Sequence, residues 1–145
     1  MFQKLLILCT GNICRSPLAA ARLQQALDAA GRDVEIRSAG LGALPGYPAD
    51  PKARTVAEAR GLDVSKHVAR QLDADLVDWA ELILVMDRDQ RRFLIEQAPF
   101  IAGKVRLFGH WVGEEVPDPY LEELAIFEDT MDLIDQAAEE WAKRL

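Results

Sequence analysis

The sequence predicts an α/β fold: a single domain, residues 1–145, in which a four-stranded parallel sheet is flanked by helices on both faces. Three observations lead to this expectation. The chain has 145 residues, the length of one domain. Half of its residues are hydrophobic, and it contains no repeat, linker or low-complexity stretch. Short apolar runs alternate with segments of helical periodicity, an order typical of a parallel sheet covered on both sides.

The first strand, loop and helix follow from the residue pattern. Residues 4–9 (KLLILC) are a short apolar run, which predicts a buried strand. A polar loop follows, and a helix is expected from Pro17 to just before Gly31, with Ser16 as its N-cap. Residues 34–38 (VEIRS) alternate between apolar and polar side chains, as in a second strand.

The rest of the chain continues this alternation. Residues 39–50 are rich in glycine and proline and predict an irregular loop. Downstream, helices are expected over residues 51–60, 73–80 and 87–97 and in the C-terminal segment, and strands over residues 81–86 and 104–108. In the C-terminal segment, apolar residues step by three or four positions from Phe127 to Leu145, which indicates one continuous buried stripe.

Charge and composition argue against several classes of function. The net charge of −7, from 17 basic and 24 acidic residues, disfavours binding to nucleic acids or anionic membranes. The apolar run near the N-terminus is too short for a signal peptide or a transmembrane helix, so we expect a cytoplasmic protein with no membrane insertion. Two cysteines and two histidines are too few for a zinc site of the usual spacing.

The loop after the first predicted strand carries the strongest chemical signal. It begins with Cys9 and ends with Arg15, immediately before a helix. Successive backbone N–H groups in such a loop can form an anion-binding nest, and the Arg15 guanidinium matches the geometry of a phosphate. The same positive field favours the thiolate form of Cys9. A thiolate at the floor of an oxyanion cradle is a nucleophile for phosphorus.

Three other interpretations of the glycine-containing loops are weaker. Cys9 could be a small buried apolar residue, which is the ordinary case for a lone cysteine. The chain has no G-x-x-x-x-G-K-[ST] sequence, so it has no nucleotide P-loop. The glycines of residues 40–46 follow a predicted strand, but a proline occurs where a dinucleotide site needs a helix to begin.

A mechanism through a phosphocysteine also needs a proton donor for the leaving oxygen and later a base for water. The candidate is Asp118, which Pro119 restricts to an extended backbone on a stiff loop. An ordinary Asp-Pro turn is the alternative. Because this loop follows the fourth predicted strand, we expect it at the same edge of the sheet as Cys9.

The sequence C-T-G-N-I-C-R-S-P at residues 9–17, with D-P-Y at residues 118–120, resembles the low-molecular-weight protein tyrosine phosphatases. S-A-G at residues 38–40 and H-V-A-R-Q-L at residues 67–72 fall in the family's order, so the resemblance covers the whole chain. The resemblance implies a two-step hydrolysis of phosphomonoesters that needs no metal and no cofactor. It makes Cys9 the nucleophile, Arg15 the residue that holds the phosphoryl group and Asp118 the general acid.

The resemblance also implies supporting roles. The loop residues expected to bind the substrate are Thr10, Gly11, Asn12, Ile13, Cys14 and Ser16. The residues expected to support the loop or the substrate wall are Ser38, Leu41, His67 and Tyr120. Of these, His67 is interpreted as a hydrogen-bonded structural histidine that supports the loop, because such histidines are commoner than catalytic ones. Inhibition by phosphate-like oxyanions is expected.

Within the family, the chain is most similar to bacterial members paired with tyrosine autokinases of capsule and exopolysaccharide export, through residues 39–44 and 107–111. This similarity implies a phosphotyrosine protein, namely such an autokinase, as partner. Eukaryotic members place a bulky aromatic residue in the loop at about residues 41–47, where this chain has Leu41, Leu44 and Tyr47. Their peptide preference therefore does not transfer to this chain.

Alternative activities are distinguished by single features of the sequence. Arsenate reduction passes a disulfide to cysteines further downstream, and none follows Cys14. Relatives that hydrolyse phosphoarginine carry threonine where this chain has Ile13. A non-catalytic phosphate-binding module would require Cys9 to be inert.

The role of Cys14 stays open between two possibilities: a cysteine that captures oxidised Cys9 as a disulfide, and a small residue that packs in the core.

Overall fold

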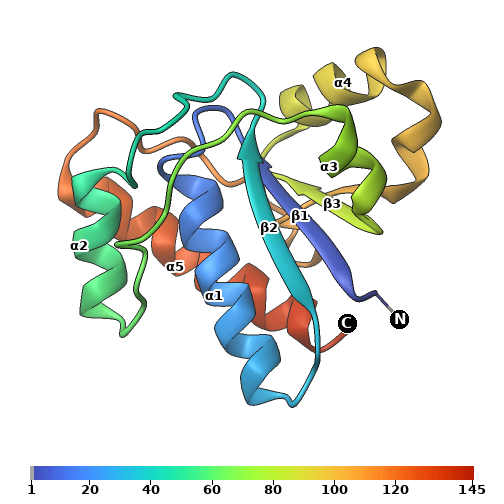
Figure 1. The fold of residues 1–145 in the computed structure, drawn as a ribbon. Helices are drawn as coiled ribbons and strands as arrows, with labels where there is room; N and C mark the ends of the chain where they lie inside the picture. Colours follow the sequence, from blue (N-terminus) through green and yellow to red (C-terminus); the bar gives the residue numbers. More distant parts are fainter. Residues whose placement is uncertain (1) are drawn as a thin grey trace.

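The computed structural model describes residues 2–145 and confirms the predicted fold class. Four parallel strands form one sheet in the order β2-β1-β3-β4 (Figure 1). The strands are β1 (Lys4–Cys9), β2 (Glu35–Gly40), β3 (Leu82–Val85) and β4 (Val105–Leu107). Because all four run in the same direction, the loops that follow them gather at one edge of the sheet, where α/β proteins bind their ligands.

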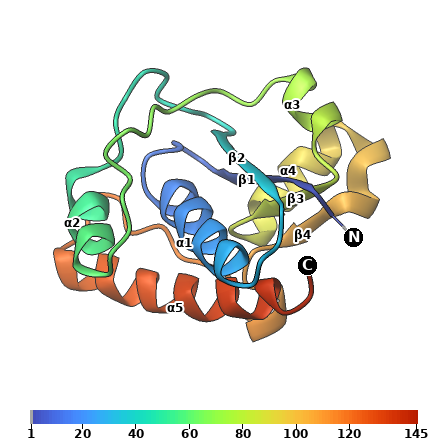
Figure 2. The same cartoon turned by 60° about the horizontal axis from the view of Figure 1, so that its bottom comes forward.

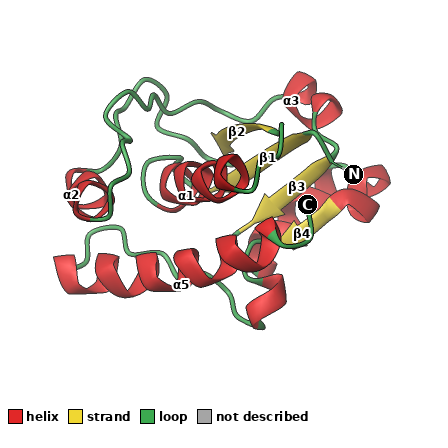
Figure 3. Cartoon of the chain, turned by 90° about the horizontal axis from the view of Figure 1, so that it is seen from below, coloured by secondary structure: helices red, strands yellow, loops and turns green. Residues whose placement is uncertain are grey.

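Helices cover both faces of the sheet (Figures 2 and 3). On one face lie α1 (Arg15–Ala29), α2 (Pro51–Ala59) and α5 (Leu124–Ala142), and on the other lie α3 (Ala74–Trp79) and α4 (Arg88–Gln97). Short 3₁₀ helices, η1 (Pro99–Lys104) and η2 (His110–Val112), flank β4.

The alternation of side chains along β1 explains why both faces need a cover. Leu5 and Ile7 pack against the core on the side of α1 and α5, whereas Leu6 and Leu8 pack against the core on the side of α3 and α4. All four side chains are fully buried, as expected for a central strand of a parallel sheet. The predicted stripe of α5 is buried from Phe127 to Trp141, and its packing against α1 closes the first core.

The first helix begins earlier than the sequence predicts, and the prediction of Ser16 as its N-cap is wrong. Helix α1 starts at Arg15, and its N-cap residue, Cys14, makes no capping hydrogen bond through its side chain. The Ser16 hydroxyl instead contacts Cys9 and Asn12, so it belongs to the loop's own network. The end of the helix is as predicted, because Gly31 adopts the left-handed conformation, with φ of 72°, just after the last turn.

The second strand is also longer than predicted, because it includes Ala39 and Gly40. Its register pairs every residue of β1 with one of β2, ending at Cys9 with Gly40. A Cβ at Gly40 would lie 2.6 Å from the Thr10 carbonyl oxygen, so only glycine permits this close approach. The end of β2 is thereby packed directly against the loop that follows Cys9.

Among residues 2–145, no helix is long and apolar enough to span a membrane.

Candidate active site

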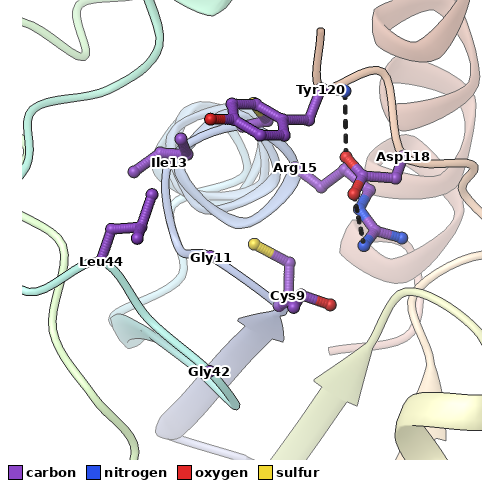
Figure 4. A pocket seen from close by; sticks show the side chains of 10 residues that line it. Cys9, Gly11, Ile13, Arg15, Gly42, Leu44, Asp118 and Tyr120 are labelled. Atoms are coloured by element: carbon purple, nitrogen blue, oxygen red, sulfur yellow. Dashed lines mark hydrogen bonds and ion pairs between the residues drawn. The ribbon is translucent and has the colours of Figure 1, made fainter.

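A pocket of about 190 Å³ opens at the carboxyl edge of the sheet (Figure 4). Its lining comes from the loop after β1, the loop after β2 and the loop before α5. The lining residues are Cys9, Thr10, Gly11, Ile13, Cys14, Arg15, Gly42, Leu44, Asp118 and Tyr120. The structure thus brings together residues that are more than 100 positions apart in the sequence, including the three predicted catalytic residues.

Cys9 lies at the end of β1, with only 3 % of its surface exposed. Its Sγ is 2.9 Å from the Ser16 Oγ. The same Oγ accepts a hydrogen bond of 2.7 Å from the Asn12 Nδ2. Since a hydroxyl has one proton and Oγ is already an acceptor for Asn12, that proton is available to the sulfur. A hydrogen bond donated to sulfur stabilises the thiolate, the nucleophilic form of cysteine.

Asn12 is the centre of the network that shapes this loop. It is fully buried, and its backbone is left-handed, with φ of 59°. Its Nδ2 donates to the hydroxyls of Ser16 and Ser38, at 2.7 and 3.1 Å, and its Oδ1 accepts from the Arg70 N–H at 3.0 Å. The His67 Nε2 is 2.6 Å from the backbone carbonyl oxygen of Asn12. Four of the residues expected to bind or support the phosphoryl group, Asn12, Ser16, Ser38 and His67, therefore form one hydrogen-bonded unit.

Burial lowers the pKa of His67 below its ordinary value, and the hydrogen bond to the Asn12 carbonyl opposes this shift only in part. The imidazole is therefore neutral at pH 7, with Nε2–H as the donor to that carbonyl. This geometry fits a residue that positions the loop.

Arg15 is 3 % exposed and points its guanidinium towards the loop before α5. Its Nη1 donates to the Val116 carbonyl at 2.9 Å and lies 3.3 Å from Asp87 Oδ2. Its Nη2 lies 3.7 Å from Asp118 Oδ2. A buried cation at the rim of a pocket is suited to bind an oxyanion, and two carboxylates compensate its charge.

Asp118 lies on the opposite rim from the loop after β1, and its side chain is 49 % exposed. Its Oδ1 accepts a hydrogen bond of 3.1 Å from the Tyr120 N–H. The Tyr120 ring, Ile13 and Leu44 surround the mouth of the pocket in Figure 4. The pocket therefore combines a buried thiol and a buried cation with a carboxylate and apolar walls at its entrance.

A family model described as "low molecular weight phosphotyrosine protein phosphatase" matches residues 4–145 of this chain. The chain belongs to this family. The phosphatase is 40 % identical to Ptp of Acinetobacter johnsonii, over 99 % of both chains. It is 42 % identical to Wzb of Escherichia coli K12 and to a probable EpsP of Ralstonia solanacearum, in each case over 100 % of this chain and 97 % of the relative. All three relatives are named as low molecular weight protein-tyrosine-phosphatases, which are phosphoric monoester hydrolases.

Solved structures agree with this assignment. The phosphatase matches Vibrio vulnificus Wzb in complex with benzylphosphonate at 41 % identity, with a TM-score of 0.94 over 100 % of both chains. It also matches the YwlE arginine phosphatase, in a variant with a phosphorylated active-site serine, at 28 % identity and a TM-score of 0.94, over 99 % of this chain and 95 % of that one.

Two residues that contact the segment after β1, from Cys9 to Ser16, were not recognised in the sequence as site residues. Asp87 follows β3 and contacts Arg15, while its other oxygen caps α4 through the Gln90 N–H at 2.8 Å. Gln90 is buried, accepts from the Met86 N–H at 2.8 Å and donates to the Thr10 hydroxyl at 3.2 Å. The available signal was the position of Asp87 at the carboxyl end of a predicted strand, where it was expected only as the start of the helix over residues 87–97.

The structure places Leu41 outside the phosphatase pocket, although it was expected in the substrate wall. Leu44 and Gly42 line the pocket instead, and Leu41 lines a neighbouring depression. The reason is that the Leu41 N–H donates to the Cys9 carbonyl and the Leu44 N–H to the Gly11 carbonyl, at 3.0 and 3.2 Å, which fixes the loop with Leu44 over the entrance.

Cys14 combines features of both possibilities left open by the sequence. It lines the pocket, and it is also buried in the core on the side of α1. Burial, reinforced by the charges of Asp50 and Asp118, raises the pKa of the Cys14 thiol far above its usual range. Cys14 is therefore protonated at rest, and its capture of oxidised Cys9 stays a prediction.

Proposed function

We propose that this phosphatase hydrolyses phosphotyrosine in proteins through a phosphocysteine intermediate. The observation that carries the proposal is the position of the Cys9 sulfur inside a pocket whose rim holds Arg15 and Asp118. The Cys9 thiolate attacks phosphorus, and an S–P bond forms as the bond to the phenolic oxygen breaks. Asp118 gives its proton to that oxygen, while Arg15 and the loop's backbone N–H groups hold the phosphoryl oxygens.

In the second step Asp118, now ionised, takes a proton from water, and the water oxygen attacks phosphorus. The S–P bond breaks, inorganic phosphate leaves, and the Cys9 thiolate is restored. The half-exposed position of Asp118 supports both roles, because the carboxylate needs access to the leaving group first and to water afterwards. The phosphorylated serine named for the YwlE variant supports a covalent intermediate on this loop.

An aryl ester fits the walls of the pocket. Ile13, Leu44 and the Tyr120 ring provide apolar surface around the entrance, at the level where the ring of a phosphotyrosine would lie. The benzylphosphonate bound by Vibrio vulnificus Wzb carries an aromatic ring next to a phosphoryl group, which supports this placement. We infer on the same grounds that phosphate-like oxyanions inhibit the enzyme.

For the physiological substrate, we infer a bacterial tyrosine autokinase that controls exopolysaccharide or capsule production, acting in the cytoplasm. The inference is supported by about 40 % identity to phosphatases named EpsP and Wzb over their full length. The test is to treat the phosphorylated cytoplasmic domain of the tyrosine kinase encoded nearest to this phosphatase. Phosphate should be released from its tyrosines; a kinase domain that stays phosphorylated would contradict the inference.

The mechanism is tested by replacing the nucleophile. Cys9→Ser should abolish turnover of aryl phosphates while the protein remains folded, because an unactivated hydroxyl is a poor nucleophile at neutral pH. In the wild type, acid quenching during turnover followed by mass spectrometry should find phosphate on Cys9. Cys14, five positions along the same loop, is the internal control and should carry none. Sustained turnover by Cys9→Ser would contradict the mechanism.

A further inference from the structure

A second depression lies beside the catalytic pocket and has no part in the reaction described above. It shares Thr10 and Gly42 with the pocket. Its other lining residues are Leu41, Asp87, Asp89, Gln90 and Phe93. We propose that this depression, the Phe93 groove, binds an apolar side chain of the substrate protein that lies close in sequence to the phosphotyrosine. The proposal rests on the proposed function, because it takes the pocket to hold the phosphotyrosine.

The walls of the Phe93 groove offer apolar surface to a partner. Phe93 lies on α4 with 50 % of its surface exposed. Leu41 lines the same groove and is partly buried against the core on the side of α3 and α4. An apolar side chain placed between them would remove its own surface and theirs from water.

The groove is also preformed, so that binding requires little ordering of the protein. The Gly42 N–H donates to the Thr10 carbonyl at 3.0 Å, and the Gln71 side chain donates to the Leu41 carbonyl at 2.8 Å. On the other side, the buried Gln90 holds the Thr10 hydroxyl at 3.2 Å. These bonds fix both walls relative to the loop that holds the phosphoryl group.

Gly42 marks the boundary between the pocket and the groove and leaves it open. A Cβ at this position would have no atom within 4 Å, and Gly42 is not among the glycines with positive φ. The fold therefore does not require glycine here for conformational reasons. The missing side chain leaves a path along which a peptide backbone can pass from the phosphotyrosine in the pocket to a neighbouring residue in the groove.

The charges around the groove favour an apolar occupant over an acidic one. Its lining residues, all in the described part of the chain, include two carboxylates and no cationic side chain. The Asp87 carboxylate contacts Arg15, but the Asp89 side chain is 90 % exposed and has only a surface ion pair with Arg92, at 3.1 Å. An aspartate or glutamate in the groove would meet like charge. Because Arg15 and Arg92 already pair the two carboxylates, the apolar walls decide the occupant, and leucine, isoleucine, methionine or phenylalanine fits best.

The experiment uses phosphotyrosine peptides with alanine at the three positions on either side, into which leucine or glutamate is placed one position at a time. For the wild type, leucine at one of these positions should raise kcat/KM by about tenfold over alanine, the usual scale for an apolar subsite. Glutamate at that position should give a lower kcat/KM than alanine. In Phe93→Ala, the advantage of leucine should fall to the level of alanine.

The matched control is Phe100→Ala, which removes the same side chain from a site that is 81 % exposed and lies in η1, outside both the pocket and the groove. It should keep the leucine preference of the wild type, and thermal unfolding should show both variants folded. Equal rates for leucine and alanine at all positions, or a preference unchanged in Phe93→Ala, would overturn the groove alone. Failure to hydrolyse any phosphotyrosine peptide would overturn the proposed function, and the groove with it.

Discussion

The two loops that carry the candidate catalytic groups are built in opposite ways. In the segment from Cys9 to Ser16, Asn12 and Ser16 are fully buried, and Arg15 is 3 % exposed. In the segment from Val116 to Leu121, Val116 is buried, its N–H donates to the Met86 carbonyl at 2.9 Å, and Pro119 is buried too, but the other residues are exposed. There, the Asp118 side chain is 49 % exposed and Leu121 is 82 % exposed.

This difference matches the chemistry expected of each loop. A nucleophile and an oxyanion cradle act best when their positions are fixed before the substrate arrives, because no reorganisation is then needed during the reaction. A proton donor that later becomes a base must reach first a leaving group and then water. Substitutions in the buried loop should therefore change both stability and rate, whereas substitutions in the exposed loop should change rate alone.

The largest effect in the exposed loop is expected for Asp118→Asn, which should slow hydrolysis by about 10²–10⁴-fold, the range of general acid catalysis. The free energy of unfolding should barely change, because the side chain is half exposed. The loss of rate should shrink for aryl phosphates with more acidic phenols, since these leave without a proton. A steady-state series of substituted aryl phosphates measures this, and an equal loss across the series would remove Asp118 from this role.

In the buried loop, Asn12→Ala should lower the free energy of unfolding by about 2–4 kcal/mol. It removes three side-chain hydrogen bonds, and alanine tolerates the left-handed backbone at this position less well than asparagine. Turnover should fall as well, since Ser16 loses the bond that orients it towards Cys9. Tyr120→Phe, the counterpart in the exposed loop, should change stability by less than about 0.5 kcal/mol. Urea denaturation compares the variants, and similar losses would contradict the contrast between the loops.

The sequence predicted the layers of the fold because they depend on local patterns. Strand β1 and helix α5 are examples, since an apolar run and an apolar stripe each specify the face that is buried. The start of α1 was missed because the Ser16 side chain bonds to Asn12 and Cys9, whereas a local rule assigns it to the helix N-terminus. That choice depends on Ser38 and Arg70, which are distant in the sequence.

The same limit applies to the site. Cys9, Arg15 and Asp118 could be proposed because motif and topology place them at one edge of the sheet. Leu44 lines the pocket and Leu41 does not, because the Leu41 N–H bonds to the Cys9 carbonyl and the Leu44 N–H to the Gly11 carbonyl. No pattern in the sequence specifies these two hydrogen bonds. The contact between Asp87 and Arg15 likewise appears only when β1 and β3 lie side by side.

A smaller effect, on selectivity, is expected at the mouth of the buried loop. Ile13 is 7 % exposed and lines the pocket. Because a similar solved structure is that of an arginine phosphatase, YwlE, phosphoarginine is the substrate to compare with aryl phosphates. Ile13→Thr offers a hydroxyl to a guanidinium and should raise the ratio of phosphoarginine to aryl phosphate hydrolysis by about tenfold. Competition assays on both proteins measure the ratio. An unchanged ratio would place the selectivity elsewhere in the wall, with Leu44 as the nearest candidate.

The smallest effect concerns how the stability of the buried loop depends on pH. Burial lowers the pKa of His67 below its ordinary value of 6.5, so the unfolded chain takes up this proton at a higher pH than the folded protein does. Just below pH 6.5 the unfolded state therefore binds more protons, and stability should fall as the pH decreases through this window and stay unaffected above it.

His67→Gln keeps an N–H donor for the Asn12 carbonyl but cannot titrate, so its stability should vary less with pH in this window. Urea denaturation between about pH 5 and pH 8 measures the slope, with His110→Gln, at the exposed second histidine, as the control that should retain it. A slope that survives in His67→Gln would mean that the histidine beneath the catalytic loop is not the group that titrates.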